Sequence, residues 1–165
     1  MKVYDTNFIK DQFPALQRKV WDKKLVYLDS AASMQKPKRV LDSISKSYSF
    51  NYSNVHRGLH KLSEEATAKY EGSRIKVAKF INCSENEVIF TSGATAALNL
   101  IAYSWGMKNL SASDEIIITI AEHHANIVPW QIIAEQKNVK IKAAHVDPNS
   151  DFNPDIITDL VTDKT

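Results

Sequence analysis

The feature that most constrains the fold is a regular alternation of apolar runs and helical segments in the second half of the chain. Three runs have the pattern of buried strands: 88–91, 115–120 and 139–146. Three segments with helical patterning follow them in turn: 95–105, 127–136 and 154–161. Strands that alternate with helices form a mainly parallel sheet covered by helices, because each helix is the crossover to the next strand. The chain is therefore predicted to be an α/β protein.

The first half is predicted to be mostly helical. Helices are expected at 6–13, at 37–48 with Pro37 in the first turn, and at 63–81 with Ser63 as the cap. We predict a single partial domain with three segments, which are an N-terminal arm (1–36), a helical segment (37–86) and the start of an α/β domain (87–165). Three parallel strands with an open edge are a poor stopping point, so the sequence is expected to be the front part of a larger protein.

Composition and charge exclude several classes of function. The 21 basic and 19 acidic residues give a net charge of +2, so nucleic acid and membrane surfaces are not expected as partners. The single cysteine, Cys83, excludes an internal disulfide and is typical of a reducing compartment. No signal sequence and no apolar run of membrane-spanning length is present. A cytoplasmic location is expected.

The turn between the first strand and its helix is a candidate phosphate site. Ser92, Gly93 and Ala94 are small enough for close backbone approach, and Thr95 adds a hydroxyl at the start of the helix. Free N–H groups and the helix dipole favour an anion at such a point. The alternative is that these residues only cap the helix, as they do in many strand-to-helix turns.

Two further segments hold candidate site residues. His123 lies just after the strand at 115–120, at the sheet edge where α/β proteins bind ligands, and its ring could stack on an aromatic cofactor. The alternative is a structural histidine. Arg57 could bind a carboxylate or phosphate, or could simply be solvated. His56 and His60 are four residues apart, but Gly58 lies between them and no metal site is predicted.

Four stretches together resemble the cysteine desulfurases of the SufS type, in the class V aminotransferase group of pyridoxal-phosphate (PLP) enzymes. The stretches are Val26–Pro37, Asn54–His60, Phe90–Thr95 and Glu122–Gln131. The resemblance implies the large domain of a PLP-dependent transferase, a three-layer α/β/α fold with a mainly parallel sheet, here truncated.

The resemblance also implies roles for individual residues. Gly93, Ala94 and Thr95 would bind the cofactor phosphate, and His123 would stack on the pyridine ring. The substrate pocket would be bordered by Ala31, Ala32, His56 and Arg57. Members of the SufS type often have Thr at the position of Ala94 and an acidic residue at that of Ala96. The backbone N–H of Ala94 remains available to a phosphate.

The activity that the resemblance implies is conversion of L-cysteine to L-alanine, with sulfur passed to an enzyme persulfide and then to an acceptor protein for iron–sulfur cluster assembly. A homodimer is implied as well. The family's Schiff-base lysine and nucleophilic cysteine would fall beyond Thr165, so the chain alone is expected to be inactive. The alternatives are a non-catalytic binding or dimerisation module and another class V enzyme, such as a selenocysteine lyase.

Overall fold

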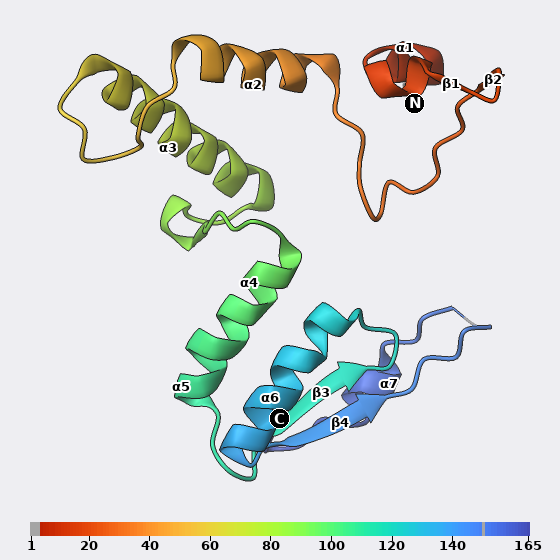
Figure 1. The fold of residues 1–165 in the computed structure, drawn as a ribbon. Coiled ribbons are helices and arrows are strands. Elements are labelled where there is room, and N and C mark those ends of the chain that lie inside the picture. Colours follow the sequence, from red (N-terminus) through yellow and green to blue (C-terminus); the bar gives the residue numbers. More distant parts are fainter. Residues whose placement is uncertain (1–3, 150) are drawn as a thin grey trace. The chain divides into compact units, whose positions relative to one another are not determined.

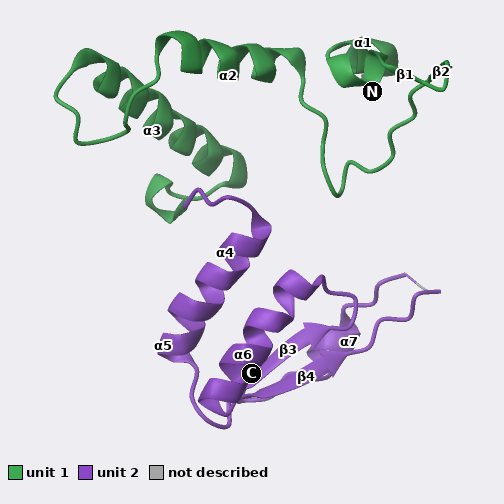
Figure 2. Ribbon diagram, in the orientation of Figure 1, with its two compact units in different colours: residues 1–88 green, residues 89–165 purple. Residues whose placement is uncertain are grey.

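The computed structural model describes residues 4–149 and 151–165, shown as a ribbon in Figure 1. The chain divides into two compact units, residues 1–88 and residues 89–165, which Figure 2 distinguishes by colour. Each unit has its own elements, and each is described by itself.

Unit 1 is an N-terminal arm followed by two longer helices (Figure 1). Its elements in chain order are α1 (Thr6–Asp11), η1 (Pro14–Gln17), β1 (Lys19–Val20), β2 (Lys23–Lys24), α2 (Lys38–Phe50), α3 (Lys61–Ile81) and η2 (Glu85–Glu87). Strands β1 and β2 form a small antiparallel hairpin. Its two turn residues, Trp21 and Asp22, both have left-handed backbones, which is the geometry of the tight turn that favours such hairpins.

The starts of α2 and α3 differ slightly from the prediction. Pro37 is the N-cap of α2 and not a residue of its first turn. The prediction that Ser63 caps α3 was wrong, because the helix begins two residues earlier and His60 is the N-cap. Ser63 lies inside the first turn and is buried, where its hydroxyl donates to the carbonyl oxygen of Asn54 at 2.9 Å. The serine therefore joins the preceding loop to the helix.

Unit 2 contains the α/β part of the chain. Its elements are α4 (Ala94–Ile101), the π-helical turn η3 (Ala102–Gly106), α5 (Met107–Asn109), β3 (Glu115–Thr119), the 3-10 turn η4 (His124–Asn126), α6 (Val128–Lys137), β4 (Lys140–Ala144) and α7 (Asp155–Thr158). Strands β3 and β4 are parallel, with Glu115 opposite Lys140 and Thr119 opposite Ala144. Helix α6 connects them and lies beside the two strands, running roughly along their direction, in Figure 1. The expected parallel α/β arrangement is confirmed.

The core of unit 2 lies between η3 and α6 and extends to the start of β4. Its buried residues are Ala102, Leu110, Ile133, Ala134 and Val139. A Cβ placed on Gly106 would lie 3.2 Å from the ring of Trp130, so the missing side chain lets the π-helical turn pack closely on α6. Burial of these apolar side chains is the main stabilising term of the unit.

The expected strand at 88–91 was wrong. The described structure has no strand there, since Ile89 and Phe90 belong to no ladder of backbone hydrogen bonds. An extended segment becomes a strand only when a neighbour takes up its N–H and C=O groups. Both side chains remain exposed, at 69% and 41%, although their apolar character predicted burial.

Several predicted helices are shorter or less regular than expected. Helix α1 ends at Asp11 and not at Phe13, and α7 spans only Asp155–Thr158. The helix expected at 95–105 begins one residue earlier, at Ala94, and changes to π geometry after Ile101. Periodicity indicates that a helix is present, but its ends depend on capping contacts that periodicity does not contain.

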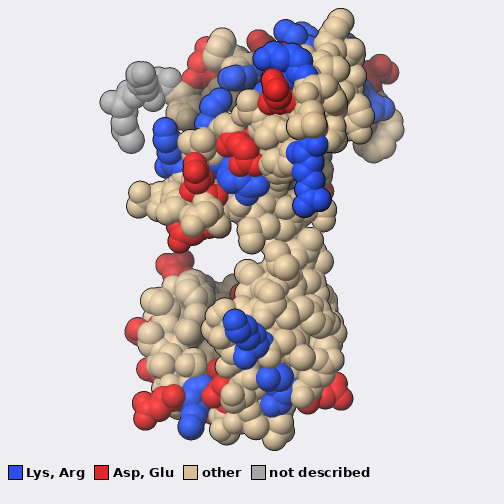
Figure 3. Space-filling view, turned by 90° about the vertical axis from the view of Figure 1, so that its left-hand side faces the viewer, with Lys and Arg blue, Asp and Glu red and all other residues tan. Residues whose placement is uncertain are grey.

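Within residues 4–149 and 151–165, no helix is long and apolar enough to span a membrane. On the face drawn in Figure 3, Lys and Arg residues are interspersed with Asp and Glu residues, with uncharged surface between them. Both signs of charge are thus present on this face, as the nearly equal numbers of basic and acidic residues allow.

Glu115 at the start of β3 makes the stability of unit 2 pH-dependent. Its carboxylate accepts from Lys142 Nζ at 2.5 Å and from the Thr162 hydroxyl at 2.6 Å. The hydrogen bond from Lys142, followed by that from Thr162, lowers the pKa of Glu115 below its usual value of 4.5. Below pH 4.5 the unfolded chain therefore binds more protons at this group than the folded chain does. The stabilising contribution is complete above pH 4.5 and is lost as the pH falls through the folded-state pKa.

We therefore expect the melting temperature of unit 2 to fall between pH 5 and pH 3, and to fall less steeply in Glu115→Gln. Thermal melts followed by circular dichroism at several pH values measure this. The control is Glu135→Gln, which changes an exposed carboxylate on α6. Equal slopes for the wild type and Glu115→Gln would contradict the prediction.

Candidate functional site

The predicted phosphate turn is an uncapped helix N-terminus. Gly93 is the N-cap of α4 and no side chain caps the helix. The first backbone N–H of the helix that is hydrogen-bonded belongs to Ala97, which donates to the carbonyl oxygen of Gly93 at 3.1 Å. Within the described residues, the N–H groups of Ala94, Thr95 and Ala96 donate no hydrogen bond. Three N–H donors at the positive end of the helix can therefore receive an anion.

The space in front of this turn is open. A Cβ placed on Gly93 would meet no atom within 4 Å, and residues 91–95 are exposed. The Thr91 hydroxyl stabilises the turn by donating a hydrogen bond to the carbonyl oxygen of Gly93 at 3.0 Å. The turn is thus formed by local contacts, and its donors remain accessible.

His123 is the N-cap of η4, and η4 contacts α4. Its Nδ1 accepts from the backbone N–H of Ala125 at 3.1 Å, so this ring nitrogen is unprotonated in the described geometry. The bond limits rotation of an exposed imidazole, whose neighbour His124 lies edge-on with ring centroids 6.2 Å apart. The structure therefore holds the ring of His123 in place and leaves it accessible for stacking.

Sequence analysis missed a chain of polar contacts beside His123. The Glu122 carboxylate accepts from the Thr119 hydroxyl at 3.2 Å and from the Asn126 amide at 2.9 Å, and the Asn126 oxygen accepts from Trp130 Nε1 at 3.1 Å. These residues line a cavity of about 260 Å³ against the isoleucines of β3. Glu122 lies in a bend, Asn126 in η4 and Trp130 in α6, so these contacts cross three local structures and no single periodic pattern indicated them.

The loop that contains His56 and Arg57 lies against α3 in unit 1. Both residues have left-handed backbones, with φ of 62° and 51°. The N–H of His56 donates to the Thr67 hydroxyl at 2.8 Å, and the amide of Asn54 donates to the carbonyl oxygen of His56 at 3.1 Å. The exposed Arg57 is thus held on a loop with fixed backbone geometry.

The two histidines of this loop face different partners. The Nε2 of His56 lies 2.8 Å from a carboxylate oxygen of Glu71, whereas His60 Nδ1 accepts from the backbone N–H of Ser63 at 3.4 Å. In the part of the chain that the structure describes, no group of three or more His, Cys, Asp or Glu residues could hold a metal ion.

Ala31 and Ala32 lie in an exposed turn of unit 1. The N–H of Ser33 donates to the carbonyl oxygen of Asp29 at 3.1 Å, and the Tyr27 hydroxyl donates to the carbonyl oxygens of Asp29 and Ser33. The turn is therefore closed by contacts from residues next to it in the sequence.

The eight predicted site residues fall in both units. Unit 2 holds the phosphate turn, at residues 93–95, and His123, which are connected through the contact between α4 and η4. Unit 1 holds Ala31 and Ala32 in one turn and His56 and Arg57 in another loop. The structure therefore describes each half of the predicted site separately.

Comparison with known families identifies the group to which these segments belong. Residues 26–165 match the aminotransferase class-V family, which is most of the chain. The chain belongs to the aminotransferase class-V family. All four sequence stretches that resemble the cysteine desulfurases lie within residues 26–165.

Similar class-V proteins are named for sulfur chemistry. The chain is 46% identical over 158 residues to a Synechocystis protein named "Probable cysteine desulfurase", covering 95% of this chain and 38% of that protein. It is 44% identical to a Salmonella newport protein named "Cysteine desulfurase", with 95% and 39% covered. The chain thus spans about two fifths of the length of these curated relatives.

Solved structures of proteins named as cysteine desulfurases confirm the fold. A cysteine desulfurase from Escherichia coli, CsdA, matches with a TM-score of 0.80 at 35% identity, covering 98% of this chain and 40% of that one. An apo cysteine desulfurase from Thermococcus onnurineus matches with a TM-score of 0.81 at 30% identity, covering 92% and 36%. The expectation of a partial α/β large domain of this kind is consistent with these coverages.

Proposed function

We propose that this chain supplies the phosphate-binding turn and the substrate loop of a PLP-dependent cysteine desulfurase. The observation that carries the proposal is the uncapped N-terminus of α4, with three unbonded backbone N–H donors beside the open space at Gly93 and the exposed Thr95. Relatives at 44–46% identity named as cysteine desulfurases support the choice of reaction.

The residues of unit 2 fit the cofactor. The N–H groups of Ala94 and Thr95 bind the phosphate, and the absence of a side chain on Gly93 allows close approach. His123, fixed through its Nδ1, stacks on the ring. Bound PLP supplies an electron-withdrawing ring that stabilises negative charge on the substrate.

The residues of unit 1 fit an amino-acid substrate. The guanidinium of Arg57 is an exposed group that binds a carboxylate through two parallel hydrogen bonds. Ala31 and Ala32 have small side chains on an exposed turn and leave room beside the backbone. These three residues, together with His56, form the border of the substrate pocket in our proposal.

The finer features of the reaction belong to the same proposal. The substrate is L-cysteine, the product is L-alanine, and sulfur passes through an enzyme persulfide to an acceptor protein of iron–sulfur cluster assembly. We further propose that the protein is of the SufS type, forms a homodimer and is located in the cytoplasm. The chain is proposed to divide into three segments, with boundaries after residues 36 and 86. The relatives named as cysteine desulfurases support the substrate and the reaction. The other features rest on the resemblance of the four sequence stretches alone.

A PLP titration of the purified chain tests the proposal. Binding is expected to shift the backbone amide signals of residues 94–96, and Thr95→Val is expected to raise the Kd about tenfold or more, because a hydrogen bond to a charged group contributes about 1.5–3 kcal/mol. Thr95→Ser keeps the hydroxyl and is expected to keep most of the affinity. Two-dimensional ¹H–¹⁵N spectra report both the site and the Kd.

Pyridoxal without its phosphate is the matched ligand control and is expected not to shift residues 94–96. Equal binding of pyridoxal and PLP, or shifts confined to other residues, would contradict the proposed role of this turn.

A further inference from the structure

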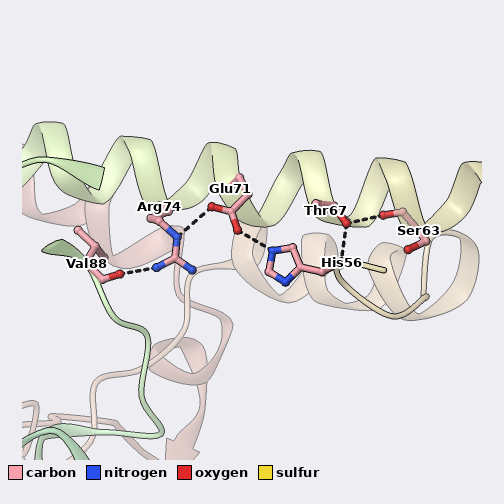
Figure 4. A network of polar contacts seen from close by, with 6 residues as sticks. All are labelled: His56, Ser63, Thr67, Glu71, Arg74 and Val88. Atoms are coloured by element: carbon pink, nitrogen blue, oxygen red, sulfur yellow. Dashed lines mark hydrogen bonds and ion pairs between the residues drawn. The ribbon is translucent and has the colours of Figure 1, made fainter. Parts of the chain in front are cut away.

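A network of polar contacts centred on the Glu71 carboxylate of α3 holds the imidazole of His56 (Figure 4). One oxygen of Glu71 lies 2.8 Å from His56 Nε2, and the other accepts from Arg74 Nε at 2.9 Å. The same guanidinium donates through Nη1 to the carbonyl oxygen of Val88. Glu71 thus binds both the imidazole of His56 and the guanidinium of Arg74. The guanidinium is held in turn by the carbonyl oxygen of Val88.

The backbone of the loop is held by other contacts. The Thr67 hydroxyl accepts from the N–H of His56 and donates to the carbonyl oxygen of Ser63 at 2.7 Å, and the Ser63 hydroxyl donates to Asn54. None of these bonds involves the imidazole or Glu71. The His56–Glu71 contact therefore determines the state of the ring and not the path of the loop.

The chemistry of Glu71 determines which ring nitrogen has the proton. The hydrogen bond from His56, followed by that from Arg74, lowers the pKa of Glu71 below 4.5, so its carboxylate is ionised at neutral pH. An ionised carboxylate only accepts hydrogen bonds, and therefore His56 Nε2 is protonated. In the neutral ring, Nδ1 is then the atom with a free electron pair.

We propose that Glu71 is a positioning residue that holds His56 as the Nε2–H tautomer and so presents Nδ1 as the acceptor atom of the substrate loop. The proposal rests on the proposed function, in which this loop borders the substrate pocket. An open hollow at this place is lined by His56, Arg57, Gly58, Glu64, Thr67 and Glu71. An amino-acid substrate that binds Arg57 through its carboxylate would find in Nδ1 an acceptor for its N–H or S–H group.

Other groups near the ring do not replace Glu71 in this role. The ring of Tyr70 lies edge-on to the imidazole, with centroids 5.8 Å apart, and the Arg74 guanidinium lies over Tyr70 at 5.2 Å from the ring centroid. Glu64 lines the hollow but forms its ion pair with Lys61, at 3.8 Å. Glu71 is thus the carboxylate that contacts the imidazole.

Tautomer spectra of the ¹⁵N-labelled chain at pH 8.5 test the proposal. The pH is well above the usual imidazole pKa of about 6.5, so neutral rings are observed. His56, assigned from the signal lost in His56→Gln, is expected as the Nε2–H tautomer with a ring proton slow to exchange with solvent. A wild-type ring without such a protected proton would overturn the proposal, whatever any variant does.

The variant Glu71→Gln provides the second arm. Its amide has one acceptor oxygen, which Arg74 Nε–H also needs, so the amide NH₂ turns toward His56 Nε2 and donates to it. The expected result is loss of the protected Nε2 proton and appearance of the Nδ1–H tautomer. The matched control, Glu64→Gln, is expected to leave the spectrum of His56 unchanged.

An unchanged tautomer in folded Glu71→Gln would overturn the proposal. The result is independent of the PLP titration, because the phosphate turn lies in unit 2 and the tautomer is measured without ligand. Failure of PLP binding with the expected tautomer spectra would remove the proposed function and leave the role of Glu71 in the ring state intact.

Discussion

Replacing Ile133 by alanine is expected to destabilise unit 2 by about 2–5 kcal/mol, the range for truncating a fully buried aliphatic side chain. Ile133 on α6 has no exposed surface and lies in the core with Ala102 and Leu110. Truncation leaves a cavity between α6 and the π-helical turn, in addition to the loss of buried apolar area. Amide hydrogen exchange of β3 and β4 measures the loss as a fall in protection.

The control for this prediction is Ile101→Ala. Ile101 lies on α4 in the same unit, but its side chain is 49% exposed. We expect a much smaller loss of protection, because less apolar surface is removed from a buried environment. Similar losses for the two variants would show that the core does not lie where the structure puts it.

Replacing Gly58 by alanine is expected to destabilise unit 1 by about 1–3 kcal/mol, the usual cost of overpacking a filled site. A Cβ at this position would lie 2.1 Å from the hydroxyl oxygen of Ser63 and 2.3 Å from its Cβ. Neither atom can move away freely, because Ser63 is buried in the first turn of α3. Reduced amide protection in α3 and shifted signals from residues 54–60 are the expected observations.

The same helix offers an opposite control. A Cβ on Gly72 would meet no atom within 4 Å, so Gly72→Ala is expected to stabilise α3 by about 0.5–1 kcal/mol. The double variant Gly58→Ala/Ser63→Gly removes both clashing atoms and is expected to recover part of the protection lost in Gly58→Ala. A Gly58→Ala variant as stable as the wild type would contradict the close packing of the loop on α3.

The sequence alone predicted the β3–α6–β4 unit well. The apolar run at 115–120 and the helix at 127–136 were found within one residue of the observed ends, because their residues pair or pack with neighbours close in the chain. The segment at 88–91 has the same apolar character but was wrongly predicted as a strand. Strand formation depends on a partner, and a single apolar run contains no information about whether one lies beside it.

The candidate site shows the same division between local and distant contacts. The turn and the start of α4 were predicted from the small residues at 92–94, since both are local features. The sequence left open whether these residues cap the helix, and the structure shows no side-chain cap. The contact between His56 and Glu71 joins residues 15 positions apart and depends on how the loop turns back on α3. Left-handed backbones at His56 and Arg57 accompany that turn, and positive φ is too uncommon outside glycine for the sequence to have predicted it at two successive residues.

The π-helical turn at Ala102–Gly106 adds one residue between the start of α4 and the surface that packs on α6. A π turn contains one residue more than an α-helical turn in the same position. Residues after it are therefore rotated by about 100° relative to an uninterrupted α-helix. A Cβ on Gly106, the last residue of this turn, would lie 3.2 Å from the ring of Trp130 on α6. Deleting one residue from the turn would leave the start of α4 unaltered and rotate the packing surface away from α6. The packing of unit 2 can therefore be disrupted without changing the candidate phosphate turn.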